Sequence, residues 1–320
     1  MTASLICGIS GQDGAYLARL LLEKGYEVIG SSRDAQISNF SNLVHLGIRG
    51  DVRVESMAIN DFRSVLQVVN KTKPDEIYNL AGQSSVALSF EQPVETLESI
   101  MSTTINLLEV IRFLDRPIRF YNAGSGESFG DTSGVAAHEE TPFRPRSPYA
   151  VAKAAAFWQV ANYREAYDLF ACTGILFNHE SPLRPERFVT RKIIAAACRI
   201  GRGSRERLRL GNTAIQRDWG WAPEYVEAMW LMLQRKNPED FVIATGKSHA
   251  LSEFAALAFD YFGLRWQEHT DIDPLILRPT DILYGCGDAG KALRLSGWSA
   301  QTQMAGVINN MIEAELEEYR

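Results

Sequence analysis

Two side chains one helical turn apart in this sequence are suited to proton and hydride chemistry. The segment SPYAVAK holds Tyr149 and Lys153, and a separation of four residues places both on one face of a helix. An ammonium group beside a phenol favours the phenolate, so we expect Lys153 to lower the pKa of Tyr149 toward neutral pH. A tyrosine of that kind can take a proton from a hydroxyl while a hydride leaves the same carbon atom.

A second segment, AGSGESFG (123–130), places a carboxylate and hydroxyls beside glycines, directly after the apolar run IRFYNA. Its Gly-x-Gly spacing also occurs in phosphate-binding loops. We interpret it instead as the end of a strand that turns into a cleft and presents Ser125 and Glu127. The reason is that another segment of the chain is better suited to hold phosphate.

That segment is GISGQDG, in which Gly8, Gly11 and Gly14 lie between a strand-like run (4–9) and a helical run (15–25). Glycine at such a junction allows a tight turn and close approach of a ligand to the backbone. The N-terminus of the following helix offers free N–H groups and the positive end of its dipole to a pyrophosphate. A strand, this glycine spacing and a helix in that order predict a dinucleotide-binding site.

The end of the next strand distinguishes between the two nicotinamide cofactors. Sites for NAD usually carry an acidic residue there, which binds the ribose hydroxyls. This chain has Ser32 and Arg33, which suit a 2′-phosphate and therefore favour NADP. Asp34 follows directly, so NAD stays possible. Lys153 can hold the nicotinamide ribose of either cofactor.

The elements that must position these residues follow a simple order. Up to residue 177 the chain alternates short apolar runs with amphipathic stretches, which is typical of βαβ units and of a parallel sheet covered on both faces. The strand-like runs are 4–9, 26–31, 75–82, 118–124 and 170–177, and the helical runs are 15–25, 95–114 and 148–167. We therefore predict an α/β fold of the Rossmann type with a doubly wound parallel sheet.

After residue 178 this rhythm is lost, and the strand-like run 240–246 returns to it. Further helical runs are expected at 189–201 and 223–235. We expect a cofactor-binding domain of residues 1–177 with a returning segment near 213–246. A smaller substrate-binding lobe would comprise residues 178–212 and 247–320.

The composition excludes several classes of protein. A net charge of −6 argues against a partner that is a nucleic acid. No apolar run approaches the roughly 20 residues that span a bilayer, and the N-terminus lacks the layout of a secretory signal, so we expect a cytoplasmic protein without a membrane partner. Cys7, Cys172, Cys198 and Cys286 lack the paired spacing of a metal site, so we expect reduced thiols and no metal.

Four segments in the second half of the chain carry a family resemblance. They are GILFNHESPLRPERFVTRKI (174–193), RLGN (209–212), RDWGWAPEYV (217–226) and RPTDILYGCGDAGKA (278–292). Together with GQDG, YNL and SPYAVAK, they resemble the GDP-mannose 4,6-dehydratases, which belong to the extended short-chain dehydrogenase/reductases. The similarity covers almost the whole chain, and the FNHESP block is its most specific part.

The resemblance implies a nucleotide-sugar enzyme with an internal redox reaction. In that reaction the C4 hydroxyl of the hexose is oxidised, the C5 proton is removed, the C6 hydroxyl leaves as water and the hydride returns to C6. Carried over to this chain, Tyr149 accepts the hydroxyl proton, Ser125 hydrogen-bonds near C4 and Glu127 removes the C5 proton. The implied substrate is GDP-mannose or a related GDP-sugar. Relatives in this family form dimers and tetramers, so we expect a homodimer or homotetramer.

The residues that we expect in the site form three groups. The catalytic group is Ser125, Glu127, Tyr149 and Lys153. The cofactor-binding group is Gly8, Gly11, Gln12, Asp13, Gly14, Ser32, Arg33, Leu80, Ala81, Tyr149, Lys153 and His179. The substrate-binding group is Ser84, Asn178, Arg184, Val189, Lys192, Gly211, Asn212, Arg217, Arg278 and Asp281. The cations of the last group can form charge-assisted hydrogen bonds with a diphosphate.

The chain departs from the family pattern in the catalytic segment. Aligned with the family's ASTSELYG, it has Ser125, Gly126 and Glu127, and Gly126 cannot help to protonate the leaving hydroxyl. This departure slows the loss of water, leaves the role to Glu127 or water, or marks a changed reaction. Asp281 stands for a glutamate, and Ala58 stands for an aspartate expected at the adenine amino group. The exact sugar therefore stays open.

Two other functions fit the same motifs. A 4-epimerase or 4-keto reductase acting on a related nucleotide sugar needs Tyr149, Lys153 and the Ser125 hydroxyl but not Glu127, whose presence favours dehydration. A non-catalytic NADP-binding sensor commonly lacks the tyrosine, which this chain retains. We therefore favour an NADP-dependent nucleotide-sugar 4,6-dehydratase, a hydro-lyase.

Overall fold

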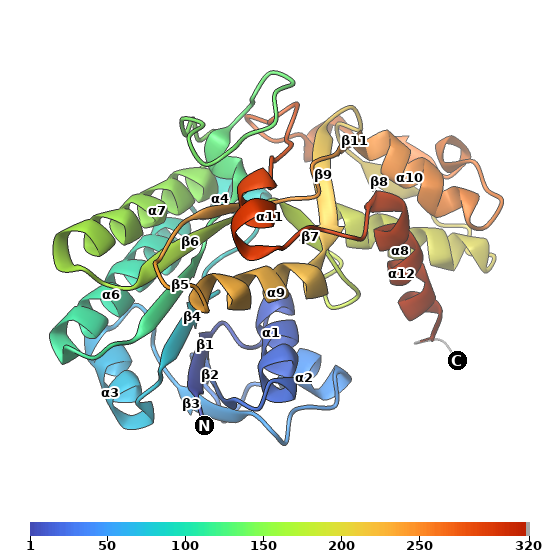
Figure 1. The fold of residues 1–320 in the computed structure, drawn as a ribbon. Helices are drawn as coiled ribbons and strands as arrows, with labels where there is room; N and C mark the ends of the chain where they lie inside the picture. The colour runs from blue at the N-terminus through green and yellow to red at the C-terminus, as the bar shows by residue number, and fades with distance from the viewer. Residues whose placement is uncertain (318–320) are drawn as a thin grey trace.

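The computed structural model describes residues 1–317, and it is built around one seven-stranded parallel sheet with the strand order β10-β6-β5-β4-β1-β2-β3 (Figure 1). The strands are β1 (Ala3–Cys7), β2 (Glu27–Ser32), β3 (Arg53–Ser56), β4 (Glu76–Asn79), β5 (Arg119–Ala123), β6 (Ala171–Leu176) and β10 (Phe241–Ile243). The order reverses direction between β1 and β4, which is the arrangement of the predicted doubly wound fold. The α/β prediction is confirmed.

Helices cover both faces of this sheet, which explains why both faces of its central strands are buried. On one face, Leu5 of β1 and Phe120 of β5 pack with α3 (Phe62–Thr72), α6 (Thr103–Leu114) and α7 (Pro148–Tyr167). On the other face, Ile6 and Tyr121 pack with α1 (Gln12–Glu23) and α9 (Ala222–Leu233). Alternate residues of each strand therefore support opposite helical layers.

The predicted elements and the observed ones differ mainly in detail. The helices expected at 148–167 and 189–201 have these bounds in α7 and in α8 (Val189–Gly201). The run 95–114 is not one regular helix, because a π-helical turn, η1 (Glu98–Ser102), separates α5 (Pro93–Leu97) from α6. Strand β3 and helix α3 lie in a stretch for which no element was predicted. The remaining short elements of the first half are α2 (Ser41–His45), α4 (Val86–Glu91) and η2 (Gly126–Phe129).

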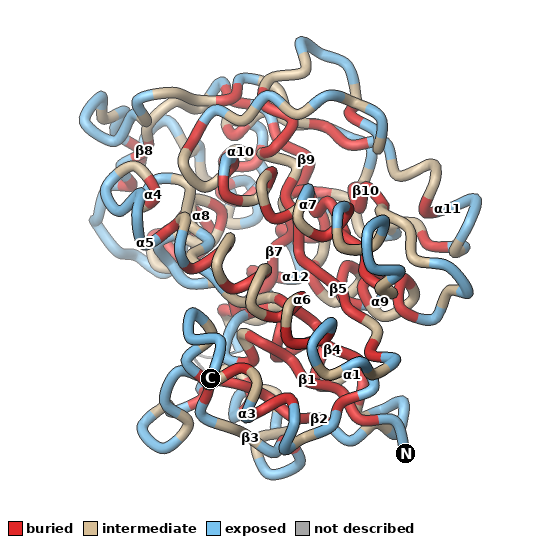
Figure 2. The backbone as a smooth tube through the Cα atoms, turned by 90° about the vertical axis from the view of Figure 1, so that its left-hand side faces the viewer, coloured by how far each residue is buried: buried red, intermediate tan, exposed pale blue. Residues whose placement is uncertain are grey.

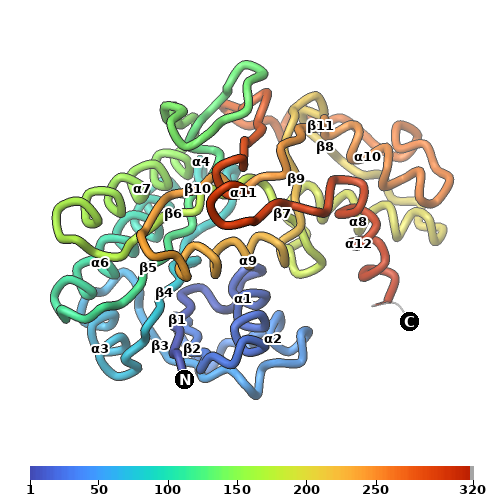
Figure 3. Tube along the Cα trace, in the orientation of Figure 1, coloured from blue at the N-terminus to red at the C-terminus, as the bar shows by residue number. Residues whose placement is uncertain are grey.

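The second half of the chain adds a separate apolar core beside the sheet, drawn to the right of it in Figures 1 and 3. Helices α8, α10 (Leu251–Asp260) and α12 (Met304–Glu317) pack together in this core. It also contains two small sheets, with the orders β11-β9-β7 and β12-β8. Their strands are β7 (Asn178–Glu180), β8 (Leu208–Leu210), β9 (Gln216–Trp221), β11 (Ser248–Ala250) and β12 (Thr270–Ile272). The short elements η3 (Trp266–Glu268) and η4 (Pro274–Ile276) lie in this part of the chain, whereas α11 (Gly290–Ser296) packs beside the main sheet, where its Ala292 joins the first core.

Burial follows this organisation, with buried backbone concentrated in the strands and in the inner faces of the helices (Figure 2). All four cysteines are buried and unpaired. Within residues 1–317 no group of acidic, histidine or cysteine side chains is arranged to hold a metal ion. In that same part of the chain, no helix combines the length and the apolar character that crossing a membrane requires.

Candidate active site

The loop between β1 and α1 requires glycine at two of its three motif positions. Gly8 has φ of 88°, and a Cβ there would lie 2.9 Å from the backbone carbonyl carbon of Leu80. A Cβ at Gly14 would lie 2.8 Å from the Cα of Ile9. Glycine therefore lets β1, the β4 end and the start of α1 come together, as the motif predicts.

The N-terminus of α1 is suited to an anion. Gly11 is its N-cap and supplies no side-chain hydrogen bond, so the N–H groups of the first turn have no side-chain acceptor at the cap. Gln12 and Asp13 begin the helix. Backbone N–H groups at a helix N-terminus beside a tight glycine turn form the donor set that a dinucleotide pyrophosphate needs. The residues present therefore fit such a cofactor.

Asp13 forms a partly buried pair with His179, which belongs to β7. His179 Nε2 lies 2.9 Å from Asp13 Oδ2, and Nδ1 lies 2.8 Å from the carbonyl oxygen of Phe177. Burial by itself raises the pKa of the Asp13 carboxyl, but the charge and hydrogen bond of His179, together with Gln12, lower it to about 2. Burial acts to lower the pKa of His179, yet Asp13 and the Phe177 carbonyl raise it. Both ring nitrogens are therefore occupied by protein acceptors.

The residues expected at a 2′-phosphate lie at the end of β2. Ser32 is half-buried and Arg33 is exposed. The Asp34 carboxylate accepts hydrogen bonds from the backbone N–H groups of Gln36 at 2.9 Å and Ile37 at 3.3 Å. The Asp34 carboxylate is thus engaged by the backbone of its own loop. The exposed Arg33 guanidinium therefore stays available to a ligand at the end of β2.

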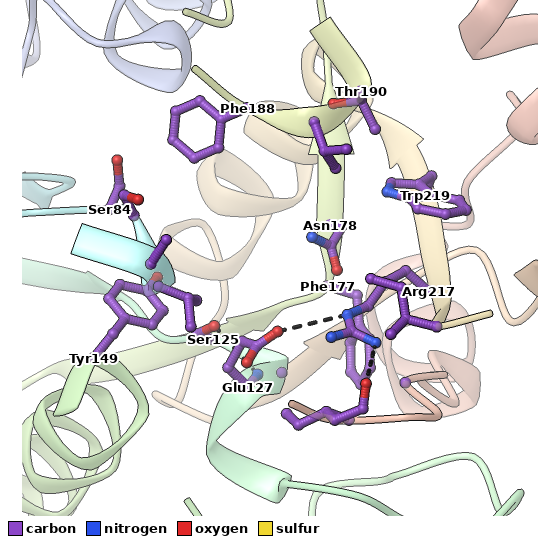
Figure 4. A pocket seen from close by; sticks show the side chains of 18 of the residues that line it. Ser84, Ser125, Glu127, Tyr149, Phe177, Asn178, Phe188, Thr190, Arg217 and Trp219 are labelled. Atoms are coloured by element: carbon purple, nitrogen blue, oxygen red, sulfur yellow. Dashed lines mark hydrogen bonds and ion pairs between the residues drawn. The ribbon is translucent and has the colours of Figure 1, made fainter. Parts of the chain in front are cut away.

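The segment 123–130 turns at the carboxyl end of β5. Ser125 is the N-cap of η2, and its hydroxyl accepts a hydrogen bond of 3.3 Å from the backbone N–H of Glu127. The side chain of Glu127 is 15% exposed and points into the pocket, with Ser125 and Tyr149 beside it (Figure 4). The turn therefore presents both side chains to the same cavity.

The ring of Phe177 packs against the glycine between them. A Cβ at Gly126 would lie 3.0 Å from three carbon atoms of this ring, which is tighter than most Cβ contacts in proteins. Phe177 is 6% exposed and extends from the end of β6 beneath the turn. A side chain at position 126 would therefore require the Phe177 ring to shift by a few tenths of an ångström.

Tyr149 and Lys153 lie in the first turns of α7, which begins at Pro148 and is capped by Ser147. The expectation that Lys153 lowers the pKa of Tyr149 is wrong for this structure. Burial raises the pKa of Tyr149 to about 12, although its hydrogen bond with Ser125 opposes the shift. Burial also lowers the pKa of Lys153 to about 8, while Asp13 opposes that change. The Lys153 Nζ donates to the carbonyl oxygen of Ala123 at 2.8 Å and lies 5.8 Å from the centre of the phenol ring.

Most of the predicted site residues line one pocket between the sheet and the second core. Those in its wall are Asp13, Leu80, Ala81, Ser84, Ser125, Glu127, Tyr149, Lys153, Asn178, His179, Arg184, Val189, Lys192, Gly211, Asn212, Arg217, Arg278 and Asp281. The wall does not include Gly8, Gly11, Gln12, Gly14, Ser32 or Arg33. The last six lie in the glycine loop and at the end of β2, where a dinucleotide would extend away from the catalytic side chains.

The four predicted cations differ in the protein groups that they contact. Arg184 Nε lies 2.9 Å from Glu180, and Lys192 Nζ donates to the Arg209 carbonyl at 2.7 Å. Arg278 reaches Asp281 at 3.5 Å. Arg217, from β9, lies between Glu127 at 3.6 Å and Asp281 at 3.1 Å, and the dashed lines of Figure 4 mark its contacts.

Several residues of the pocket wall were not predicted, and three of them are Glu180, Gln83 and Phe177. Glu180, 1% exposed, accepts from Thr190 at 2.6 Å and holds Arg184, and it lies inside the quoted FNHESP block. Gln83 holds the loop of Ser84, because its Nε2 donates to the carbonyl of Ser85 at 2.8 Å. Gln83 follows the fourth-strand run 75–82 directly, so a search for polar residues at strand ends would have found it. Phe177 is the first residue of the same block, but its contact with Gly126 joins positions 51 residues apart and has no local signal.

Comparison with known proteins decides the family. A family model described as GDP-mannose 4,6 dehydratase matches residues 5–311. The chain belongs to the GDP-mannose 4,6-dehydratase family. It is 46% identical to GDP-mannose 4,6 dehydratase 1 of Arabidopsis thaliana, over 98% of this chain and 90% of the relative. It is 40% identical to GDP-mannose 4,6 dehydratase of Homo sapiens, over 98% of this chain and 91% of the relative.

Solved structures with the same fold lie further away in sequence. A UDP-glucose 4-epimerase of Thermotoga maritima with UDP-glucose has a TM-score of 0.89 at 20% identity, with all of both chains covered. A dTDP-glucose 4,6-dehydratase of Bacillus anthracis in complex with NAD has a TM-score of 0.86 at 17% identity, over 99% and 97% of the chains. RMD of Pseudomonas aeruginosa complexed with NADPH has 0.81 at 19%, over 99% and 100%. At these identities the neighbours show that the chain shares their fold.

Proposed function

We propose that this chain converts GDP-mannose into GDP-4-keto-6-deoxymannose by internal hydride transfer and elimination of water. The observation that carries the proposal is the convergence of Ser125, Glu127, Tyr149 and Lys153 on one pocket at the carboxyl end of β5. That pocket lies beside a glycine loop that fits a dinucleotide. Membership of the family supplies the substrate class.

NADP is the cofactor that we propose, and the bound nicotinamide would supply hydride acceptance at C4 and hydride donation at C6. The glycine loop and the first turn of α1 would hold its pyrophosphate. The exposed Arg33 guanidinium and the Ser32 hydroxyl would bind the 2′-phosphate, because Asp34 is engaged by its own loop. Lys153 would hold the nicotinamide ribose.

Tyr149 and Glu127 would carry out different proton transfers. Tyr149, hydrogen-bonded to Ser125, exchanges a proton with the C4 hydroxyl of the sugar. Glu127 removes the proton at C5, which the neighbouring ketone acidifies. Because Gly126 has no side chain, Glu127 is also the group that returns this proton to the departing C6 hydroxyl. General acid–base catalysis of this kind contributes about 10²–10⁴-fold to the rate.

The second core would form the substrate lobe, and residues 178–212 and 247–320 would supply one side of the pocket wall. The proposed contacts to the GDP-sugar are Ser84, Asn178, Arg184, Val189, Lys192, Gly211, Asn212, Arg217, Arg278 and Asp281. A cytoplasmic homodimer or homotetramer stays a prediction. Sedimentation of the purified protein would measure its assembly.

The decisive experiment incubates the purified protein with NADP and GDP-mannose and measures the mass of the product. Loss of one water supports the dehydratase. A product of equal mass with an inverted centre would instead indicate an epimerase, and an unchanged substrate would indicate a sensor or another substrate.

A Glu127→Gln variant tests the role of the base. We expect it to keep binding the substrate and to eliminate water about 10²–10⁴-fold more slowly, because the amide cannot accept the C5 proton. Stopped-flow absorbance of the nicotinamide would separate hydride transfer from elimination. Elimination at the parental rate would remove Glu127 from the mechanism.

A further inference from the structure

We propose that Arg187, an exposed arginine in the turn between β7 and α8, binds a phosphate group of a ligand in the pocket. The ligands that carry such a group are GDP-mannose and NADP, so the inference rests on the proposed function for their identity. It is carried by a separate observation, namely the difference between Arg187 and the other cations of the pocket wall.

Most lysine and arginine side chains of the pocket wall already contact an acceptor oxygen of the protein. Those that do so are Lys153, Arg184, Lys192, Arg209, Arg217 and Arg278. Arg187 belongs to the same wall, but within residues 1–317 its guanidinium makes no hydrogen bond or ion pair with a protein acceptor. Its N–H groups are therefore available to an anionic ligand.

The carboxylate next to Arg187 in the sequence is engaged elsewhere. Glu186 Oε1 lies 3.0 Å from Nη1 of Arg199 in α8. The turn itself is closed by a hydrogen bond of 3.0 Å from the backbone N–H of Phe188 to the carbonyl oxygen of Pro185. The charge of Arg187 is therefore not balanced by its acidic neighbour, and the closed turn keeps the residue at the pocket wall.

The aromatic ring of Phe188 supports this guanidinium without using its N–H groups. Cζ of Arg187 lies 5.3 Å from the ring centre, within the range of a cation–π contact. Figure 4 draws Phe188 among the side chains that line the pocket. Because the ring attracts the guanidinium through its π electrons, the hydrogen-bond donors of Arg187 stay available to the ligand.

A second arginine on the same ring increases the positive charge at this part of the wall. Cζ of Arg184 lies 4.0 Å from the centre of the Phe188 ring. The charge of Arg184 is balanced by Glu180, whose Oε2 lies 2.9 Å from its Nε, whereas Arg187 has no such partner within residues 1–317. A phosphate suits the remaining charge, because two of its oxygens match the planar fork of a guanidinium.

An Arg187→Ala variant tests the proposal by calorimetry with two probes, GDP and NADP, each titrated into the purified protein. One of the two dissociation constants should rise about tenfold at low salt, the low end for a charge-assisted hydrogen bond, because the group is exposed. The other should keep its wild-type value. A weaker affinity for GDP assigns Arg187 to the substrate, and a weaker affinity for NADP assigns it to the cofactor.

Salt dependence separates a charge contact from a change in the shape of the turn. The difference between Arg187→Ala and the wild type should shrink as ionic strength rises from about 0.01 M to about 1 M, because the Debye length falls from about 30 Å to about 3 Å. Arg187→Lys keeps the charge but lacks the planar fork, so its affinity should lie between the two at low salt. Arg205→Ala is the matched control, because Arg205 is exposed and lies outside the pocket wall, so neither dissociation constant should change.

Wild-type affinity of Arg187→Ala for both probes at low salt would overturn the proposal. A similar loss for both probes, or a loss of equal size at every salt concentration, would do the same, because either result indicates a disturbed pocket rather than one lost phosphate contact. A wild-type protein that binds neither probe would also overturn it.

None of these measurements requires turnover. A wild-type protein that binds GDP and NADP but does not dehydrate GDP-mannose would therefore count against the proposed function alone.

Discussion

At the scale of single residues, Gly126 shows how packing restricts a catalytic turn. Phe177 lies against the face that a side chain at position 126 would occupy, at 3.0 Å from a Cβ. The ring also approaches Gly287, where a Cβ would lie 2.6 Å from it. Two glycines thus make room for one aromatic ring beneath Ser125 and Glu127.

We therefore expect Gly126→Ser to destabilise the protein by about 1–3 kcal/mol, the usual effect of overpacking a filled site. Urea denaturation would measure the change in the free energy of unfolding. Gly50→Ala is the matched control, because a Cβ at Gly50 meets nothing within 4 Å and should have little effect. Equal stability of Gly126→Ser and the parent would mean that the Phe177 ring yields easily.

Arg33 provides a second test at this scale. Arg33→Ala removes the exposed guanidinium that we assign to the 2′-phosphate of NADP. A charge-assisted hydrogen bond contributes about 1.5–3 kcal/mol, so the dissociation constant for NADP should rise by about tenfold or more. Fluorescence titration should find NAD binding unchanged. An Arg205→Ala variant, which removes an exposed arginine in the second half of the chain, should change neither.

At the scale of elements, the Asp13–His179 pair joins the first turn of α1 to β7, and so ties the glycine loop to the pocket wall. The ring of His179 is also stacked on Tyr225 of α9, with ring centres 4.6 Å apart. Gln12 strengthens the junction, since its side chain donates to the His179 carbonyl at 3.2 Å and accepts from Ser181 at 2.7 Å.

This pair makes stability depend on pH in two directions. The pKa of His179 is raised in the folded state, so its contribution is full below the unfolded value near 6.5 and is lost as pH rises through the folded pKa. The pKa of Asp13 is lowered from 3.8 to about 2, so its contribution is lost as pH falls through that range. Above pH 6.5 we expect the free energy of unfolding of His179→Gln to fall less steeply with pH than that of the wild type. Urea denaturation at several pH values would measure this difference. A wild-type slope in the variant would contradict this assignment.

At the scale of the whole molecule, the second core depends on a buried ion pair between Arg191 of α8 and Glu315 of α12. Their side chains are 13% and 5% exposed. Removing one partner of such a pair leaves an uncompensated buried charge, at a cost of about 3–5 kcal/mol. Since this core forms one wall of the pocket, its loss should also weaken GDP binding.

We expect Glu315→Gln to lower the thermal midpoint of unfolding and the affinity for GDP together, as followed by calorimetry. Glu253→Gln is the control, because Glu253 pairs with His249 on the surface and is 59% exposed, where such pairs contribute about 0–1 kcal/mol. A similar loss of stability in both variants would show that burial does not increase the contribution of the Arg191–Glu315 pair to the free energy of unfolding.

Some elements of this fold could be predicted from short-range sequence patterns, and others could not. The glycine spacing, the Pro148 start of α7 and the apolar alternation are short-range signals, and they predicted the parallel sheet, the helix 148–167 and the loop at α1. The π-helical turn at Glu98–Ser102 escaped prediction, because the run around it satisfies an ordinary helical pattern.

The sequence by itself determined which chemical groups the chain carries, and the turn spacing determined that Tyr149 and Lys153 share a helix. Only the tertiary structure decided the pKa values of these two side chains. Burial, which no spacing encodes, raises the pKa of Tyr149 to about 12 against the expected lowering. The contact of Glu127 with Arg217 joins residues 90 positions apart by number, and it exists because β9 passes the carboxyl end of β5. Desolvation and long-range charge pairing are properties of the folded chain, and they decide how the groups that the sequence provides can act.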